Sequence, residues 1–287
     1  METLFETDPG EALPLSGKLA DVLAPLRLAA VQEQSRAPYL IGNMVMTLDG
    51  VVALNSAGHM SGGDISGFNL YDQVMVGTLR ALADAVIVGA ETFRVESVHV
   101  LTPQDIAPAF AEEYRQLRSA LGKTSELLNV IVTASGELNL AAPPFQQKQT
   151  PILIITTQQG LLRLQKQPWP ASLQVMAVEG DNSIAARRIV QTVRRVSQSN
   201  LLLVEGGPRL MNAFIAERCL HELFLTLAPQ IAGRDDASER PGLVKGQIFA
   251  PPDPRWSRLV SVKRAESHLL LRYALETLDS EPSMNHS

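Results

Sequence analysis

The sequence has a single cysteine, Cys219, among its 287 residues, which excludes an internal disulfide and any cysteine-rich metal site. Its five histidines are scattered singly, without the spacing of a zinc-protease motif, so we expect no metal. The GxSxG motif of hydrolases is missing, and nothing indicates a cysteine–histidine pair. Hydrolytic and metal-dependent chemistry therefore has no support in the sequence.

No two of the 19 glycines are separated by a single residue, which excludes the GxGxxG fingerprint of Rossmann dinucleotide sites. Long apolar runs are also missing, so we expect no membrane span, and the acidic start METLFETDPGEALPLSG does not resemble a signal peptide. The chain carries 25 basic and 30 acidic residues, and this net charge of −5 disfavours a nucleic-acid partner. We expect a cytoplasmic protein that acts on a small molecule.

Apolar runs alternate with helix-like segments along most of the chain. The pattern predicts buried strands at YLIGNMVM, DAVIVG, LLNVIVT, PILIITT, LQVMAV, NLLLVE and ELFLTLAP, with a short return strand at VVAL. It predicts helices from Asp64 or Ser66 to about Leu82, over 108–121, and in SIAARRIVQTV and PRLMNAFIAER. This order is typical of an α/β protein with a mostly parallel central sheet, helices on both faces and a C-terminal antiparallel hairpin.

The chain has no low-complexity linker and no internal repeat, so we expect one main domain. The predicted boundaries are an N-terminal extension over 1–36, the α/β domain over 37–276 and a disordered tail over 277–287. The stretch GRDDASERPGLVKG is polar and contains glycine and proline, which predicts an exposed loop.

Three predicted strands end in small or hydroxyl residues, in VGAET, VTAS and VEGGP. Ligands of α/β sheets bind at the carboxyl ends of strands, where backbone N–H groups and helix dipoles favour phosphate. Gly206 and Gly207 would let a pyrophosphate touch the backbone ahead of Pro208, which suits the first turn of a helix. Thr92, close behind Gly89, would add a hydroxyl. Tight turns alone would also explain the glycines, but three such junctions in one sheet favour a phosphate-bearing cofactor.

Three motifs resemble the pyrimidine reductase family of riboflavin biosynthesis, which has a dihydrofolate-reductase-like fold. They are NMVMTLDGVVA, LRALADAVIVGAETFR and LLVEGGPRLMNAFIAERCLHELFLTLAPQIAGR, which follow in order between Pro38 and Tyr273. The resemblance implies a homodimer that uses NADPH to reduce the ribosyl group of an aminouracil ribosyl phosphate to ribityl. It also implies that the glycine pair of VEGGP receives the pyrophosphate of NADPH.

The resemblance assigns roles to individual residues of the strand ends. The implied cofactor-binding residues are Val45 and Thr47 beside the nicotinamide, Thr133 and Ser135 at the adenosine 2′-phosphate, and Gly89, Ala90, Thr92, Glu205, Gly206, Gly207 and Pro208 at the phosphates and the adjoining turn. The implied substrate-binding residues are Asn43, Glu205, Arg80 and Arg94. Glu96 is the expected proton donor, with Asp49, Glu205 or water as alternatives, although Asp49 is better explained by its Asp-Gly turn.

The sequence departs from the family in two places. The zinc deaminase that precedes the reductase in bifunctional members, with its H-x-E and P-C-x-x-C ligands, is not expected here. After VGAETFR, the family continues with an acidic pair, a proline and an LT-x-R stretch that holds substrate phosphate, whereas this chain reads VESVHVLTPQD. Two other hypotheses therefore stay open: a reductase of the same fold that acts on a pterin or dihydrofolate, and a non-catalytic NADPH-binding protein.

Overall fold

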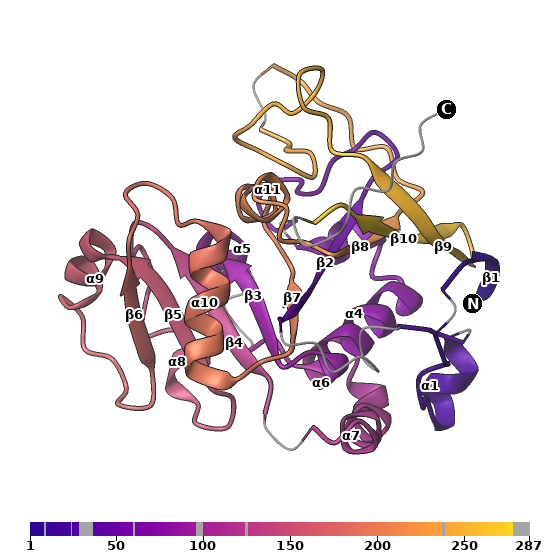
Figure 1. Ribbon diagram of the computed structural model, residues 1–287, viewed down its shortest axis with the longest axis horizontal. Coiled ribbons are helices and arrows are strands. Elements are labelled where there is room, and N and C mark those ends of the chain that lie inside the picture. The colour runs from indigo at the N-terminus through magenta and orange to yellow at the C-terminus, as the bar shows by residue number, and fades with distance from the viewer. Residues whose placement is uncertain are drawn as a thin grey trace.

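The computed structural model describes residues 1–8, 10–23, 25–28, 37–59, 61–95, 100–123, 126–236 and 239–277. These residues form a ten-stranded sheet with the order β1-β9-β10-β8-β2-β7-β3-β4-β5-β6, which runs from β6 on the left of Figure 1 to β1 on the right. The strands are β1 (Glu2–Glu6), β2 (Tyr39–Met46), β3 (Ala85–Gly89), β4 (Leu128–Thr133), β5 (Ile152–Thr157), β6 (Gln174–Val178), β7 (Leu201–Val204), β8 (Glu222–Leu227), β9 (Ser257–Ala265) and β10 (His268–Leu275).

Most of the sheet is parallel, as the sequence predicts. Every neighbouring pair from β8 through β2, β7, β3, β4 and β5 to β6 is parallel. Strands β9 and β10 form the expected antiparallel hairpin, and β10 joins it to β8. The predicted fold class, a dihydrofolate-reductase-like α/β fold, is confirmed.

Helices cover both faces of the sheet. In β7, Leu201 and Leu203 face one buried cluster, whereas Leu202 and Val204 face the other, which is why this strand reads as a continuous apolar run. The first cluster packs against α1 (Gly17–Val22), α4 (Leu70–Leu82), α6 (Pro103–Ile106) and α7 (Ala111–Ala120), and the second against α10 (Ala186–Ser197) and α11 (Pro208–Ala216). The shorter elements are α3 (Gly62–Ser66), α5 (Ala90–Val95), η1 (Pro108–Phe110), α8 (Pro143–Gln146) and α9 (Gln158–Leu164).

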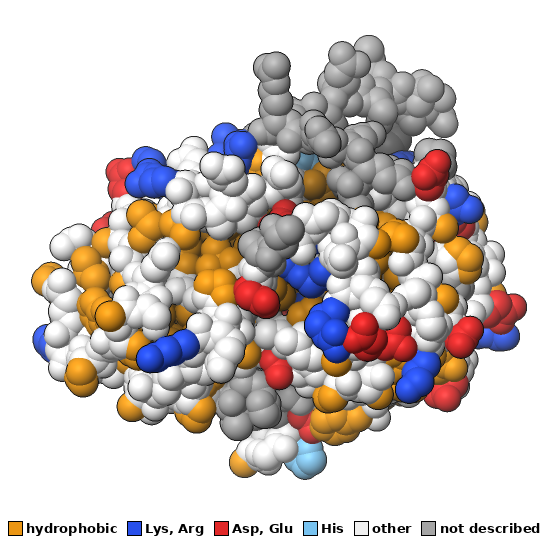
Figure 2. Space-filling view, turned by 90° about the horizontal axis from the view of Figure 1, so that it is seen from below, with side chains coloured by type: hydrophobic (Ala, Val, Ile, Leu, Met, Phe, Trp, Pro, Cys, Tyr) orange, Lys and Arg blue, Asp and Glu red, His pale blue; other side chains and the backbone are white. Residues whose placement is uncertain are grey.

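The surface carries charges of both signs. Figure 2 shows basic and acidic side chains beside one another on the face that it views, with hydrophobic side chains gathered toward the β6 end. This mixture agrees with the small net charge of −5. Among the described helices, none is long and apolar enough to cross a membrane.

The helix predicted up to Leu82 is divided in two, which corrects the prediction. Helix α3 ends where Gly67 takes a left-handed φ of 63°. Asn69 then begins α4, since its side chain accepts hydrogen bonds from the backbone N–H groups of Tyr71 and Asp72. The asparagine cap satisfies N–H groups that a continuous helix would have bonded internally.

The return strand predicted at residues 51–54 is wrong. The N–H of Thr47 donates to the carbonyl of Val51 at 3.0 Å, and the Thr47 hydroxyl accepts from the N–H of Val51 at 2.9 Å. Val52 then donates to the carbonyl of Pro241 at 3.0 Å. These bonds lead the chain away from β2, so it forms a turn against Pro241.

Residues 1–8, 10–23 and 25–28 are packed into the domain. Strand β1 pairs with β9, and this segment places five leucines in the core, namely Leu13, Leu19, Leu23, Leu26 and Leu28. Arg272 of β10 donates to the carboxylates of Asp8 at 2.7 Å and Glu222 at 2.5 Å, and Lys263 of β9 donates to the carbonyl of Pro25 at 2.9 Å. Residues 29–36 of the predicted extension and 278–287 of the predicted tail lie outside the described residues.

Candidate functional site

The two glycine-containing junctions lie beside each other because β3 and β7 are neighbouring strands. The N–H of Gly89 donates to the carbonyl of Gly206 at 2.7 Å. A Cβ atom placed on Gly207 would lie 3.0 Å from the hydroxyl oxygen of Thr92. We call these four residues the glycine cradle, because two strand ends meet there with only small groups between them.

The two adjacent glycines are needed for different reasons. Gly206 has a φ of 90°, a backbone conformation that L side chains rarely adopt. Gly207 has a φ of −73° as the residue before α11, so its lack of a side chain matters for the space beside Thr92. Pro208 occupies the first turn of α11, as the sequence predicts, and the Gly206–Gly207 peptide is cis.

The two hydroxyl residues at the end of β4 differ in whether they are open to solvent. Thr133 is buried, and its hydroxyl accepts a hydrogen bond from the N–H of Gly136 at 3.1 Å. Ser135 is exposed on the same loop, where it accepts from the N–H of Glu137 at 3.3 Å. Arg94, expected at the substrate phosphate, reaches this loop and donates to the carbonyl of Glu137 at 2.9 Å.

Arg80 and Glu205, both expected at the substrate, form a buried ion pair. The Nε and Nη2 atoms of Arg80 each donate to one carboxylate oxygen of Glu205 at 2.8 Å, and the side chains are 6% and 9% exposed. Arg80 also donates to the carbonyl of Thr102 at 3.2 Å. The pair joins α4 to the residue directly before Gly206, so it holds the glycine cradle in place.

Thr47 and Asp49 are bonded to each other. The buried Thr47 hydroxyl donates to the Asp49 carboxylate at 2.6 Å, and that carboxylate also accepts from the N–H groups of Ala232 at 3.1 Å and Gly233 at 2.8 Å. These hydrogen bonds, the one from Thr47 foremost, lower the pKa of Asp49 to about 2. Asp49 is therefore ionised at neutral pH, and it ties the turn after β2 to Ala232 and Gly233.

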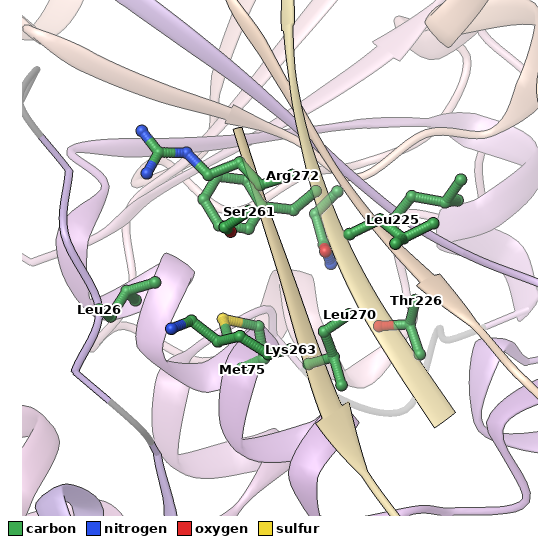
Figure 3. Close-up of a pocket in the computed structure, with 11 residues that line it drawn as sticks. Leu26, Met75, Leu225, Thr226, Ser261, Lys263, Leu270 and Arg272 are labelled. Atoms are coloured by element: carbon green, nitrogen blue, oxygen red, sulfur yellow. The ribbon is translucent and has the colours of Figure 1, made fainter. Parts of the chain in front are cut away.

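Asn43 and Val45 point to the sheet face that carries α4, whereas Met44 between them points to the face of Gly206. Asn43 lines a cavity of about 10 Å³, the size of one water molecule. Figure 3 shows this cavity, with Met75 of α4 and Thr226 of β8 among the residues around it. The structure therefore separates Asn43 from the glycine cradle by the thickness of the sheet.

Asp72, in the first turn of α4, is a buried acid that sequence reasoning missed. Asp72 is 7% exposed, and burial raises the pKa of its carboxyl above the ordinary value. Hydrogen bonds with Thr226 and Ser66, and the charge of His268, act in the opposite direction but do not outweigh burial. Asp72 therefore keeps its proton to a higher pH than an exposed aspartate.

Three further expectations concern Glu96, Ala90 and metal ions. Glu96, the expected proton donor, lies outside the described residues, so its role stays a prediction. Ala90 begins α5 directly after Gly89, at the position that the sequence predicts. Within the described ranges, no group of three or more His, Cys, Asp or Glu side chains could hold a metal ion.

The fold is a dihydrofolate-reductase-like α/β fold, and the family follows from the sequence. The chain belongs to the RibD C-terminal domain family, whose model matches residues 38–265. A search of curated proteins finds no match.

Solved structures show which proteins share this fold. The chain is similar to a pyrimidine reductase-like protein from Corynebacterium diphtheriae, at 20% identity over 91% of this chain and 99% of that chain, with a TM-score of 0.66. A diaminohydroxyphosphoribosylaminopyrimidine deaminase/5-amino-6-(5-phosphoribosylamino)uracil reductase from Thermotoga maritima is 17% identical over 84% of this chain and 57% of that chain, with a TM-score of 0.59. The riboflavin biosynthesis reductase of Saccharomyces cerevisiae is 12% identical over 85% and 92%, with a TM-score of 0.57. At these identities, the likeness shows the fold.

Proposed function

We propose that this chain is an NADPH-dependent pyrimidine reductase that converts the ribosyl group of an aminouracil ribosyl phosphate to ribityl. Membership of the RibD C-terminal domain family supports a reductase. The observation that carries the proposal is the glycine cradle, in which two strand ends approach each other with only small groups between them, directly before the start of α11. We also propose that it is a homodimer, as the resemblance implies, and that it is cytoplasmic.

The glycine cradle fits a pyrophosphate for three reasons. Helix α11 begins directly after Gly207, so its first N–H groups and its dipole favour an anion there. Gly207 leaves the space in which a Cβ would crowd Thr92, and the Thr92 hydroxyl can donate to a phosphate oxygen. Ala90, next to Gly89, starts a second helix on the same side.

The remaining cofactor positions follow the ends of β2 and β4. Ser135 is the exposed hydroxyl that would meet the 2′-phosphate, whereas Thr133 shapes the loop that carries it. Val45 and Thr47 would form the wall beside the nicotinamide, which supplies a hydride when the cofactor is bound. The Thr47 hydroxyl is bonded to Asp49, and its backbone N–H and carbonyl are bonded to Val51 and Gly50, so Thr47 would shape this wall.

We assign the expected substrate residues to two different tasks. Arg94 would contact substrate, because its exposed side chain is not tied into a buried ion pair. Asn43 would act from the sheet face opposite the glycine cradle, two residues before Val45 on β2. Arg80 and Glu205 would position the glycine cradle, because their charged groups are bonded to each other and are nearly closed to solvent. The protein would thus orient the ligands through strand ends and leave the hydride chemistry to the cofactor.

A pterin or dihydrofolate reductase of the same fold is the second candidate function. The observation that favours it is the altered motif after VGAETFR. In this segment, Thr102 is followed by Pro103 in the first turn of α6. The carbonyl of Thr102 accepts from Arg80, so this segment serves the buried pair. The arginine that follows this motif in the family, and that would hold substrate phosphate, is missing here.

A cofactor titration tests the glycine cradle. We expect Gly207→Val to weaken NADPH binding at least about tenfold, or about 1.4 kcal/mol, because the added side chain fills the pyrophosphate space beside Thr92. Gly242→Val is the matched control, since a Cβ there would meet only the carbonyl of Gly50 at 3.5 Å, an ordinary contact. Fluorescence titration of both folded variants gives the dissociation constants. Wild-type affinity in Gly207→Val would mean that the glycines serve only the turn.

A further inference from the structure

The loop after β4 is packed tightly against the start of α9. Strands β4 and β5 are parallel neighbours, so their carboxyl ends meet at one edge of the sheet (Figure 1). The hydroxyl of Thr157, the last residue of β5, donates to the carbonyl of Ala134 at 2.7 Å and accepts from the N–H of Gly160 at 3.0 Å. A Cβ atom on Gly160 would lie 2.7 Å from that same carbonyl oxygen, closer than side chains approach. The loop that carries Ser135 is therefore fixed relative to α9.

Two exposed arginines reach this loop from different helices. Arg163 of α9 forms an ion pair with the carboxylate of Glu137, and the two side chains are 46% and 61% exposed. Arg94 of α5 donates to the backbone carbonyl of Glu137 at 2.9 Å. The N–H of Glu137 in turn donates to the Ser135 hydroxyl at 3.3 Å, so the serine and both guanidinium groups meet around one residue. These bonds join two cationic side chains to one anionic side chain, which leaves the loop with excess positive charge.

The Arg163–Glu137 pair is open to solvent, so another anion can replace the carboxylate. Exposed ion pairs contribute little to stability, because water screens the charges and both side chains lose freedom. A phosphate monoester carries about 1.5 to 2 negative charges at neutral pH, more than one carboxylate, and a guanidinium binds it through two parallel hydrogen bonds. The Ser135 hydroxyl accepts in its bond with Glu137, so it can still donate its hydrogen to a phosphate oxygen.

We propose that Arg163 determines the preference for NADPH by binding its 2′-phosphate together with Ser135, an inference that rests on the proposed function. In the structure, the Glu137 carboxylate holds the guanidinium of Arg163 at the loop. The 2′-phosphate of NADPH takes the place of this carboxylate when the cofactor binds. NADH has a hydroxyl group in place of the phosphate, so Arg163 does not strengthen its binding.

Titration with both cofactors tests this role. In the full chain, Arg163→Gln should weaken NADPH binding about tenfold, or about 1.4 kcal/mol, and leave NADH binding unchanged, because only the charge at the 2′-phosphate is lost. Arg115→Gln is the matched control, since Arg115 is 70% exposed on α7 and also forms an ion pair with a glutamate, Glu112. It should bind both cofactors as wild type does. Unchanged NADPH affinity in Arg163→Gln, or an equal loss for NADH, overturns the proposal.

Glu137→Gln distinguishes this role from that of a plain surface ion pair. The glutamine no longer competes for Arg163, so NADPH should bind about two- to fivefold more tightly, which is the range expected from an exposed ion pair. NADH binding should stay the same. A plain ion pair would give no such gain, and unchanged or weaker NADPH binding in Glu137→Gln contradicts the exchange of phosphate for carboxylate.

Adenosine 2′-phosphate separates this role from catalysis, because it carries the phosphate but no nicotinamide. It should bind wild type about tenfold more tightly than Arg163→Gln. If it does, and the chain oxidises NADPH with none of the tested substrates, the proposed function fails and the role of Arg163 stands. If wild type binds NADPH and NADH equally and still reduces a substrate, the reductase stands and the role of Arg163 is wrong. Failure of wild type to bind NADPH or adenosine 2′-phosphate contradicts both.

Discussion

Thr133 and Ser135 lie two residues apart at the end of β4, but their hydroxyl groups have different tasks. Thr133 is buried and holds the N–H of Gly136, whereas Ser135 is open to solvent. From the sequence, the two hydroxyl residues are equally good candidates for binding a phosphate. Only the packing of the loop tells them apart, because it decides which oxygen is already used.

This difference predicts that substitutions of the two residues change different quantities, the cofactor preference for Ser135 and the free energy of unfolding for Thr133. Ser135→Ala should reduce the preference for NADPH over NADH by about tenfold, or about 1.4 kcal/mol, because the 2′-phosphate loses a hydroxyl partner. Thr133→Val should instead lower the free energy of unfolding by about 1–3 kcal/mol, because the N–H of Gly136 is left unbonded. Titration with both cofactors, alongside denaturant unfolding, gives the two quantities. An unchanged cofactor preference in Ser135→Ala would remove Ser135 from the 2′-phosphate site.

Asp72 shows what single-residue reasoning could have found. It is three residues before Met75 and seven before Leu79, so it falls on the buried stripe of α4. An acid on an apolar stripe is a signal for a buried carboxyl, although the sequence does not show what surrounds it. The partners Thr226 and His268 come from strands more than 150 residues further along the chain, and only the fold brings them to α4.

At the scale of elements, local chemistry predicted the junctions well. The strand, the glycines and Pro208 in NLLLVEGGP specify a strand end and a helix start by themselves, and the structure has both. The break between α3 and α4 was missed, because the apolar spacing continues across Gly67 while the cap at Asn69 interrupts the helix. The failed strand at 51–54 has a similar cause, since the side chain of Thr47 takes the hydrogen bond that a strand neighbour would need.

The Arg80–Glu205 pair connects two elements, and its role can be measured. Glu205→Leu should lower the free energy of unfolding by about 3–5 kcal/mol, because the guanidinium of Arg80 stays buried without its partner. The double variant Arg80→Met/Glu205→Leu should recover most of this loss, since no buried charge remains. Thermal and denaturant unfolding check both. If Glu205→Leu keeps wild-type stability but raises the KM for substrate, Glu205 contacts substrate instead.

At the scale of the whole molecule, the sheet is larger than the predicted domain. The sequence predicts an extension over 1–36, because the pattern of buried strands begins only after Pro38. In the structure, β1 extends the sheet and Asp8 reaches the buried Arg272. Such long-range pairing leaves no local pattern in the sequence, which is why the segment could not be placed beforehand.

Truncation tests whether this segment belongs to the folding unit. A chain that starts at residue 37 loses five buried leucines, each worth about 1.5–3 kcal/mol, so the loss is comparable to the whole stability of a domain. We expect it to aggregate or to unfold without a cooperative transition. A chain that ends at residue 277 is the control and should unfold as the full chain does. Equal unfolding temperatures for all three chains would show that residues 1–36 are dispensable.

Substrate-dependent oxidation of NADPH tests the central claim most directly. Three mixtures each contain the full chain and NADPH. One receives aminouracil ribosyl phosphate, one receives dihydrofolate and one receives no substrate, and the product is identified by mass. The account predicts oxidation with the aminouracil alone, with the product carrying two added hydrogens as its ribityl form. Oxidation with dihydrofolate alone would identify a pterin reductase. Saturable NADPH binding without oxidation in any mixture would contradict an enzyme and leave a cofactor-binding protein.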